Sequence, residues 1–139
     1  MSGNGRVALV TGASRGIGKA IALGLAERGF DLVLNDIAAQ TGVLEETAAE
    51  ARAHGNRVIA LLADVSAKVQ VQAMIAEAVA QMGAIHAVVN NAGILRASDV
   101  EHCPEDYWDS VMDVNAKGTF LVVQAVLPVM KAQDRKSVV

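Results

Sequence analysis

Short apolar segments alternate with longer segments of helical periodicity along most of the chain. The apolar segments contain few polar residues, which is typical of parallel strands buried on both faces. We expect strands at residues 6–10, 32–35, 57–62 and 85–89. The periodicity predicts helices at residues 16–28, 41–54, 67–82 and 106–132. This order predicts an α/β fold, with a parallel sheet, right-handed crossovers and helices on both faces.

The spacing of apolar residues predicts which face of the first three helices is buried. The expected buried positions are Ile17, Ile21 and Leu25, then Leu44, Ala48 and Ala51, then Val71, Ile75, Ala78 and Met82. Gly29, Gly55 and Gly83 follow these helices and predict their ends. Ser66 precedes the third helix and is a suitable N-cap.

The fourth helix begins after Pro104, which is followed by two acidic residues. We expect kinks near Gly118 and at Pro128. Residues 137–139 have the character of the first residues of a fifth strand. The pattern therefore predicts one Rossmann-like domain over residues 1–139. Its three-layer, doubly wound parallel sheet is truncated at the start of the fifth strand.

The composition narrows the classes of function. Hydrophobic residues make up 53% of the chain but aromatic residues only 3%, so the core must consist mainly of aliphatic side chains. The net charge is −3 and no basic run is present, so we expect no nucleic acid and no membrane as partner. We expect no metal site. A single cysteine, Cys103, and a start without the long apolar region of a signal peptide predict a cytoplasmic protein.

A glycine-rich turn, Thr11 to Gly18, joins the first strand to the first helix. Helix N-termini present unpaired N–H groups and a partial positive charge, so a pyrophosphate can bind there. In this interpretation Gly12 allows a tight turn and Gly16 lets the backbone approach the phosphates. Gly18 lets the helix pack closely on the sheet.

Two other interpretations of this turn are a P-loop and an ordinary turn without a ligand. A P-loop has the pattern G-x-x-x-x-G-K-S/T. Here five residues separate Gly12 from Gly18, and Ala20 stands where a magnesium-binding hydroxyl is required, which disfavours a nucleoside triphosphate. The ligand-free turn stays open on the motif alone.

The loops after the four strands should share one crevice, because doubly wound sheets bind ligands beyond the carboxyl ends of their strands. Asp36 ends the second strand, 18 residues after Gly18, close to the spacing of about 20 for the acid that binds an adenosine ribose. Its carboxylate would repel a 2′-phosphate, which favours NAD over NADP. The counter-signal is Arg15, whose guanidinium could pair with a phosphate.

The third and fourth loops carry Asp64-Val65 and the run 90–93. Asp64 could accept a hydrogen bond from the amino group of adenine. The amides and glycine of residues 90–93 suit a turn that holds neighbouring strands and a ligand. For Asp36, Asp64 and residues 90–93 alike, a plain turn is the alternative, since Asp, Asn and Gly all favour turns.

Together these residues resemble the short-chain dehydrogenase/reductase family, in its single-domain subgroup. The matching features are TGASRGIG (11–18), Asp36, Asp64-Val65, NNAG (90–93) and Asp113-Val114-Asn115 before residues 117–120. All occur in the family's order and spacing, over essentially the whole chain, which disfavours the ligand-free turn. The resemblance implies hydride transfer between NAD(P) and a ketone or secondary alcohol, with 3-oxoacyl or similar carbonyl substrates among the candidates.

The resemblance also implies a site, residue by residue. The cofactor-binding residues would be Gly12, Ser14, Arg15, Gly16, Ile17, Gly18, Asp36, Ile37, Asp64, Val65, Asn91, Ala92 and Gly93. Asn115 resembles the asparagine of the family's catalytic tetrad, which helps to position a lysine and a water chain. From its chemistry alone, Asn115 is a kink residue inside a helix.

The sequence departs from the family at its other catalytic residues, a Ser and a Tyr-x-x-x-Lys motif that follow in the fifth strand and beyond. Tyr107 is the only tyrosine and is followed four residues later by Val111, and Ser137 comes too early. We therefore expect the N-terminal, cofactor-binding half of such an enzyme. The alternative is a catalytically inactive dinucleotide-binding module.

The resemblance implies a homodimer or homotetramer, because in the family the helix that corresponds to residues 106–132 commonly packs against its copy. The expected contact residues are Leu121, Val122, Ala125, Val126 and Val129. The alternative is that these side chains face only their own sheet.

Overall fold

The computed structural model describes residues 4–133 and 137–138, which form one parallel sheet with flanking helices. The strands are β1 (Val7–Val10), β2 (Asp31–Asp36), β3 (Val58–Leu62), β4 (Ala87–Val89) and β5 (Ser137–Val138). The helices are α1 (Gly16–Glu27), α2 (Thr41–Arg52), α3 (Lys68–Met82), α4 (Glu105–Met112) and α5 (Gly118–Ala132), with a 3₁₀ turn η1 (Ala38–Gln40) and a π-helical segment η2 (Asp113–Lys117). The strand order is β3-β2-β1-β4-β5, which confirms the predicted doubly wound, Rossmann-like sheet.

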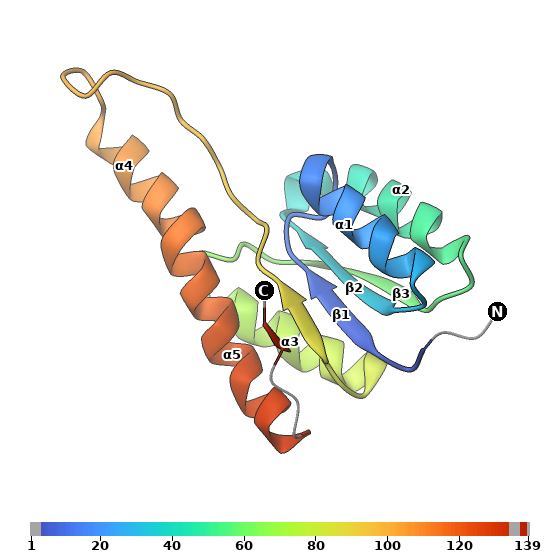
Figure 1. The fold of residues 1–139 in the computed structure, drawn as a ribbon. Helices are drawn as coiled ribbons and strands as arrows, with labels where there is room; N and C mark the ends of the chain where they lie inside the picture. Colours follow the sequence, from blue (N-terminus) through green and yellow to red (C-terminus); the bar gives the residue numbers. More distant parts are fainter. Residues whose placement is uncertain (1–3, 134–136, 139) are drawn as a thin grey trace.

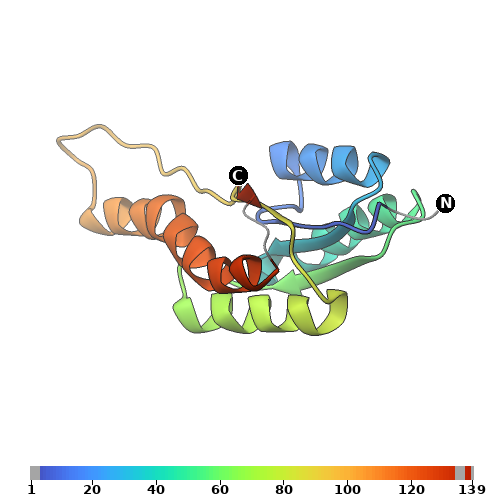
Figure 2. The same ribbon diagram turned by 60° about the horizontal axis from the view of Figure 1, so that its bottom comes forward.

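Helices cover both faces of the sheet and give three layers (Figures 1 and 2). The helices α1 and α2 lie on one face, and α3 and α5 lie on the other. In β1, Val7 and Leu9 belong to the core beneath α3 and α5, whereas Ala8 and Val10 belong to the core beneath α1 and α2. All four residues of β1 are buried, which explains the uninterrupted apolar run in the sequence.

The predicted buried faces of α2 and α3 are confirmed, but the face of α1 is wrong by one position. The fully buried residues of α1 are Gly18, Ala22 and Ala26. Ile17 is 74% exposed, and Ile21 and Leu25 only flank the core. Small residues on the buried face let α1 approach the sheet closely, because interiors are packed without room for larger side chains there.

The segment predicted as one helix over residues 106–132 is divided by η2. This π-helical segment lies directly before Gly118, where a kink was expected, and it joins α4 to α5 in one continuous rod (Figure 1). π-helical turns inside α-helices occur frequently at functional sites.

The residues expected to mediate dimer contacts along α5 face the core instead. Leu121, Val122 and Val126 are buried, and Ala125 and Val129 are partly buried against the same core. The prediction is therefore wrong for Leu121, Val122 and Val126, whereas a contact role for Ala125 and Val129 stays a prediction. The large exposed apolar residues on α4 and α5 are Trp108, Met112 and Phe120.

The helix α3 begins at Lys68, and Ser66 is not its N-cap. The N-cap position is Ala67, which makes no side-chain capping bond. Ser66 donates instead to Asp64 Oδ1, from its backbone N–H at 2.9 Å and from its hydroxyl at 2.6 Å. The serine therefore stabilises the turn that carries Asp64, as Asp and Ser do in local side-chain turns.

Two side-chain amides attach the strand β4 region to the α4–α5 rod. Before β4, Gln133 accepts from the Ile85 N–H at 3.0 Å and donates to the Ile85 carbonyl at 2.8 Å. After β4, Asn115 accepts from the Ile94 N–H at 2.8 Å and donates to the Ile94 carbonyl at 2.9 Å. Each amide pairs with one backbone residue as a neighbouring strand would.

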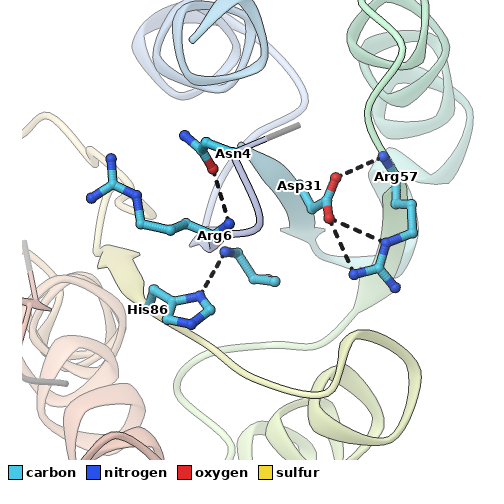
Figure 3. Close-up of polar contacts among 6 residues, drawn as sticks. Asn4, Arg6, Asp31, Arg57 and His86 are labelled. Carbon is cyan, nitrogen blue, oxygen red and sulfur yellow. Dashed lines mark hydrogen bonds and ion pairs between the residues drawn. The ribbon is translucent and has the colours of Figure 1, made fainter. Parts of the chain in front are cut away.

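Side chains also close the amino-terminal end of the sheet (Figure 3). Asp31 accepts from the Arg57 N–H at 3.0 Å and is paired with its guanidinium, and His86 Nδ1 accepts from the Val7 N–H at 2.8 Å. Asn4 accepts from the Arg6 N–H at 2.9 Å. These contacts satisfy backbone donors at the end of the sheet opposite the predicted crevice.

Candidate functional site

A pocket of about 460 Å³ lies where the loops after β1, β2, β3 and β4 converge. Its volume falls in the range of small-molecule and cofactor sites, and its position is that of the ligand crevice in doubly wound sheets. The pocket is lined by Gly12, Arg15, Ile17, Asn35, Asp36, Ile37, Gln40, Ala63, Asp64, Val65, Asn91, Ala92, Gly93, Ile94 and Val114.

The glycine turn adopts a backbone that side chains would prevent. Gly12 has a φ of +64°, and a Cβ there would lie 2.9 Å from the Ala92 Cα. A Cβ on Gly18 would clash with the Gly12 carbonyl and the Asn91 amide. Gly18 therefore allows α1 to pack against the turn and Asn91, a closer neighbour than the sheet that the sequence suggested.

Asn91 braces this turn from the loop after β4. Its side-chain amide donates to the Thr11 carbonyl at 3.1 Å and to the Gly12 carbonyl at 3.0 Å. The Thr11 hydroxyl accepts in return from the N–H groups of Asn91 and Ala92 at 3.1 and 3.0 Å. The loops after β1 and β4 are thereby held as one wall of the pocket.

Ser14 lies behind the turn with an unsatisfied hydroxyl. Its backbone N–H donates to Asp36 Oδ2 at 3.3 Å, and its carbonyl accepts from the Thr47 hydroxyl at 2.9 Å. Among the described residues, Ser14 Oγ is the buried side-chain polar atom that has no hydrogen-bond partner. Such an orphaned group is uncommon in folded proteins and marks a position where a ligand or a water molecule can form a hydrogen bond.

Asp36 presents its carboxylate at the end of β2. It is half-buried; Oδ1 accepts from the Ile37 N–H at 2.8 Å, and Oδ2 accepts from the Ser14 N–H. The carboxylate is thus oriented by backbone donors from its own loop and from the glycine turn. Carboxylate oxygens carry further lone pairs, so these bonds leave it able to accept from ligand hydroxyls.

Asp64 and Val65 form the wall after β3. The Asp64 backbone N–H donates to the side chain of Gln70 at 2.9 Å, and Oδ1 receives the two bonds from Ser66. Val65 is buried against Gly118, where an added Cβ would lie 2.6 Å from its Cγ2. This contact places the start of α5 directly behind the pocket wall.

Asn115 lies in η2 and does not line the pocket, although its neighbour Val114 does. Its amide is committed to the backbone of Ile94, and the Oδ1 atom lies 3.3 Å from the position that a Cβ on Gly93 would take. Asn115 therefore fixes the loop after β4, while its backbone lies in an irregular helical turn.

The structure brings together most of the residues predicted for the cofactor. Ser14, Gly16 and Gly18 support the turn without lining the pocket. The sequence reasoning did not include five lining residues, Asn35, Gln40, Ala63, Ile94 and Val114. Gln40 follows Ile37 by one 3₁₀ turn, and the sequence alone did not reveal this turn.

This arrangement fits a dinucleotide. The N-terminus of α1 has no side-chain cap and no acidic residue in its first turn, so its N–H groups can donate hydrogen bonds to an anion. The orphaned Ser14 hydroxyl lies in the same turn, and the Asp36 carboxylate stands beside it. An anionic group and a polyhydroxyl group would each find matching partners here.

Two further observations limit the chemistry of the described residues. No three His, Cys, Asp or Glu side chains within residues 4–133 and 137–138 gather into a group suited to a metal ion. In the same part of the chain, none of the helices combines the length and the apolar character that crossing a membrane requires.

Comparison with known proteins gives a consistent result. A family model described as short chain dehydrogenase matches residues 6–139. The chain is 41% identical over 132 residues to the 3-oxoacyl-[acyl-carrier-protein] reductase FabG of Staphylococcus epidermidis, covering 95% of this chain and 54% of that protein. It is 43% identical over 121 residues to the (2S)-[(R)-hydroxy(phenyl)methyl]succinyl-CoA dehydrogenase subunit BbsD of Thauera aromatica, covering 87% and 48%.

Solved structures show the same likeness. An NAD⁺-bound xylitol dehydrogenase matches with a TM-score of 0.92 and 34% identity, over 97% of this chain and 52% of that one. A blue fluorescent protein from a metagenomic library, in complex with NADPH, matches with a TM-score of 0.84 and 36% identity, over 90% and 51%. The chain spans about half the length of the curated relatives it matches.

Proposed function

Because the chain belongs to the short-chain dehydrogenase family, we propose that it is the cofactor-binding part of an oxidoreductase acting on a ketone or secondary alcohol. The observation that carries this proposal is the convergence of the glycine turn and the Asp36 carboxylate at one pocket, with the orphaned Ser14 hydroxyl buried behind the turn. A 3-oxoacyl or similar carbonyl compound is the candidate substrate, in line with the name of the relative FabG. The activity is proposed for a whole protein longer than this chain.

Each residue of the site has a defined task in this proposal. The turn residues Gly12 to Gly18 and the N-terminus of α1 hold the pyrophosphate. Asp36 and Ile37 hold the adenosine ribose, and Asp64 and Val65 flank the base. Asn91, Ala92 and Gly93 line the route towards the nicotinamide. When bound, the cofactor supplies or accepts the hydride.

Asn115 is proposed as a supporting catalytic residue. Its side chain is engaged with Ile94, so any contribution to a proton relay must come from its backbone or from the shape that it gives to η2. The tyrosine and lysine that move the proton in the family have no counterpart in these 139 residues. Turnover by the isolated chain would contradict the conclusion that the residues that move the proton are missing from it.

The proposed cofactor is NAD. The Asp36 carboxylate is held in place by two N–H groups at the expected ribose position, where a 2′-phosphate would meet like charge. Arg15 also lines the pocket and is exposed, and it is the one lining residue that could favour NADP by pairing with a phosphate. The similar structures include one with NAD⁺ and one with NADPH, so the preference rests on Asp36.

Calorimetric titration of the chain with NAD and NADP tests the proposal. Asp36→Ala should weaken NAD binding at least tenfold, because hydrogen bonds to a charged group contribute about 1.5–3 kcal/mol. Asp109→Ala is a matched control, since Asp109 is exposed on α4, away from the pocket. Equal NAD affinity in wild type and Asp36→Ala would contradict the role of Asp36. No binding of either dinucleotide to the wild type would contradict the proposed function.

We also propose a homodimer or homotetramer through α4 and α5. The buried residues of α5 cannot mediate it, but Trp108, Met112 and Phe120 are 64%, 43% and 58% exposed along the rod. Exposed large apolar side chains along the two joined helices favour an interface. Sedimentation should show a dimer that Trp108→Asp dissociates, and a clean monomer of the wild type at micromolar concentration would refute it.

A cytoplasmic location belongs to the same proposal, supported by the exposed thiol of Cys103.

A further inference from the structure

The 3₁₀ turn η1 places one unassigned polar side chain in the pocket. Gln40 ends η1, and its backbone N–H donates to the Ile37 carbonyl at 2.9 Å. Gln40 therefore lies one turn after Ile37, the extended residue that precedes η1. Both residues line the pocket beside Asp36.

The amide of Gln40 has capacity to bind a ligand. The residue is half-buried, and its side chain makes no hydrogen bond to any residue that the structure describes. A glutamine amide offers two donors and one acceptor, whereas the neighbouring Asp36 and Asp64 are acceptors when ionised. Asn35, the other amide beside Asp36, already donates to the carbonyls of Leu61 and Ala63, so Gln40 is the uncommitted amide at this end of the pocket.

The donor and acceptor of the Gln40 amide match one edge of adenine. The ring presents an acceptor at N7 next to a donor at the 6-amino group, and a glutamine amide can bond both together. The 6-amino group has two hydrogens, so Asp64 can accept the one beside N1 while Gln40 accepts the one beside N7. The two side chains come from two neighbouring loops of the pocket, after β2 and after β3.

We propose that Gln40 reads the N6/N7 edge of the adenine ring and is a specificity-determining residue of the cofactor site. The inference rests on the proposed function, since it requires an adenine nucleotide in the pocket. It adds selection for the base to the selection for the ribose that Asp36 provides.

Binding of AMP, 7-deaza-AMP and nicotinamide mononucleotide to the chain tests this inference. 7-Deaza-AMP keeps the amino group but replaces N7 by a C–H group. The wild type should bind it about three- to tenfold more weakly than AMP, as expected for one hydrogen bond. Gln40→Ala loses both bonds, so it should bind AMP about five- to 100-fold more weakly and lose the preference between the two. Binding of nicotinamide mononucleotide should not change.

Two further variants exclude a merely structural effect. Gln40→Glu keeps the length and the acceptor but loses the donor, and its carboxylate repels N7, so it should prefer 7-deaza-AMP. Gln72→Ala, at an exposed glutamine on α3, should behave like the wild type. A preference for AMP that survives in Gln40→Ala, or is absent from the wild type, overturns the assignment of Gln40 alone. Failure of the wild type to bind AMP or NAD overturns the proposed function and this inference with it.

Discussion

Asn91 is the residue whose removal should damage the pocket most directly. Its amide is the sole side-chain donor shown to the Thr11 and Gly12 carbonyls within the described residues, at 3.1 and 3.0 Å. Each bond contributes about 0.5–1.5 kcal/mol, so Asn91→Ala should lower the free energy of unfolding by about 1–3 kcal/mol. Asn91→Asp should be worse at neutral pH, because a carboxylate would face two carbonyl oxygens.

The loss can be converted into a melting temperature. The entropy of unfolding is about 2.1 cal/mol/K per residue, which gives about 0.29 kcal/mol/K for 139 residues. Asn91→Ala should therefore lower the melting temperature by about 3–10 °C in thermal unfolding followed by circular dichroism.

Asn90 provides the matched control for this experiment. It is the preceding residue, is equally half-buried, and makes no side-chain hydrogen bond within the described part of the chain. Asn90→Ala should leave the melting temperature within about 2 °C of the wild type, since substitutions away from such contacts change stability by about 0.5 kcal/mol or less. Equal melting temperatures for Asn91→Ala and Asn90→Ala would refute the bracing role.

Two further substitutions, Gly118→Ala and Asn115→Ala, test the support behind the pocket, and Gly42→Ala serves as a control. Gly118→Ala should lower the free energy of unfolding by about 1–3 kcal/mol, because its Cβ would lie 2.6 Å from Cγ2 of the buried Val65 and overpack the site. Gly42→Ala has no atom within 4 Å of the added Cβ, so it should raise the free energy of unfolding by about 0.4–1 kcal/mol. Urea unfolding that changes the stability of both variants in the same direction would contradict this reasoning. Asn115→Ala should raise the hydrogen-exchange rate of the Ile94 amide, which loses its acceptor at 2.8 Å, and an unchanged rate would show that this bond does not protect the loop.

The sequence was sufficient for the fold because the central strands β1 and β2 are buried on both faces. The strand Val7–Val10 contains only apolar residues, so the sequence identifies it as a buried strand. The glycines at 29, 55 and 83, which were predicted to end helices, all have positive φ in the structure. The face of α1 could not be predicted in the same way. Ile17 is the more hydrophobic residue, but only Gly18 fits beside the Gly12 carbonyl, so close packing overrides periodicity.

The site was predictable where motifs name residues and not where local geometry decides. Asp36 and Asn91 come from recognisable patterns, and the structure places both at the pocket. Ser66 was misassigned because a serine before a helix can bond either the helix or a preceding aspartate, and here Asp64 receives it. Gln40 carried no signal, since its approach to the pocket depends on η1, which no sequence period reveals.

The two amide contacts on either side of β4 determine where this chain tolerates changes in length. From Asn115 to Gln133 the rod rises about 27 Å at 1.5 Å per residue, and the nine residues from Ile85 to Ile94 reach at most about 30 Å when extended. One residue inserted into α5 would turn Gln133 by about 100° away from Ile85. The exposed loop at residues 95–103 has no such matched span, so insertions and deletions should accumulate there and be absent from the rod and β4.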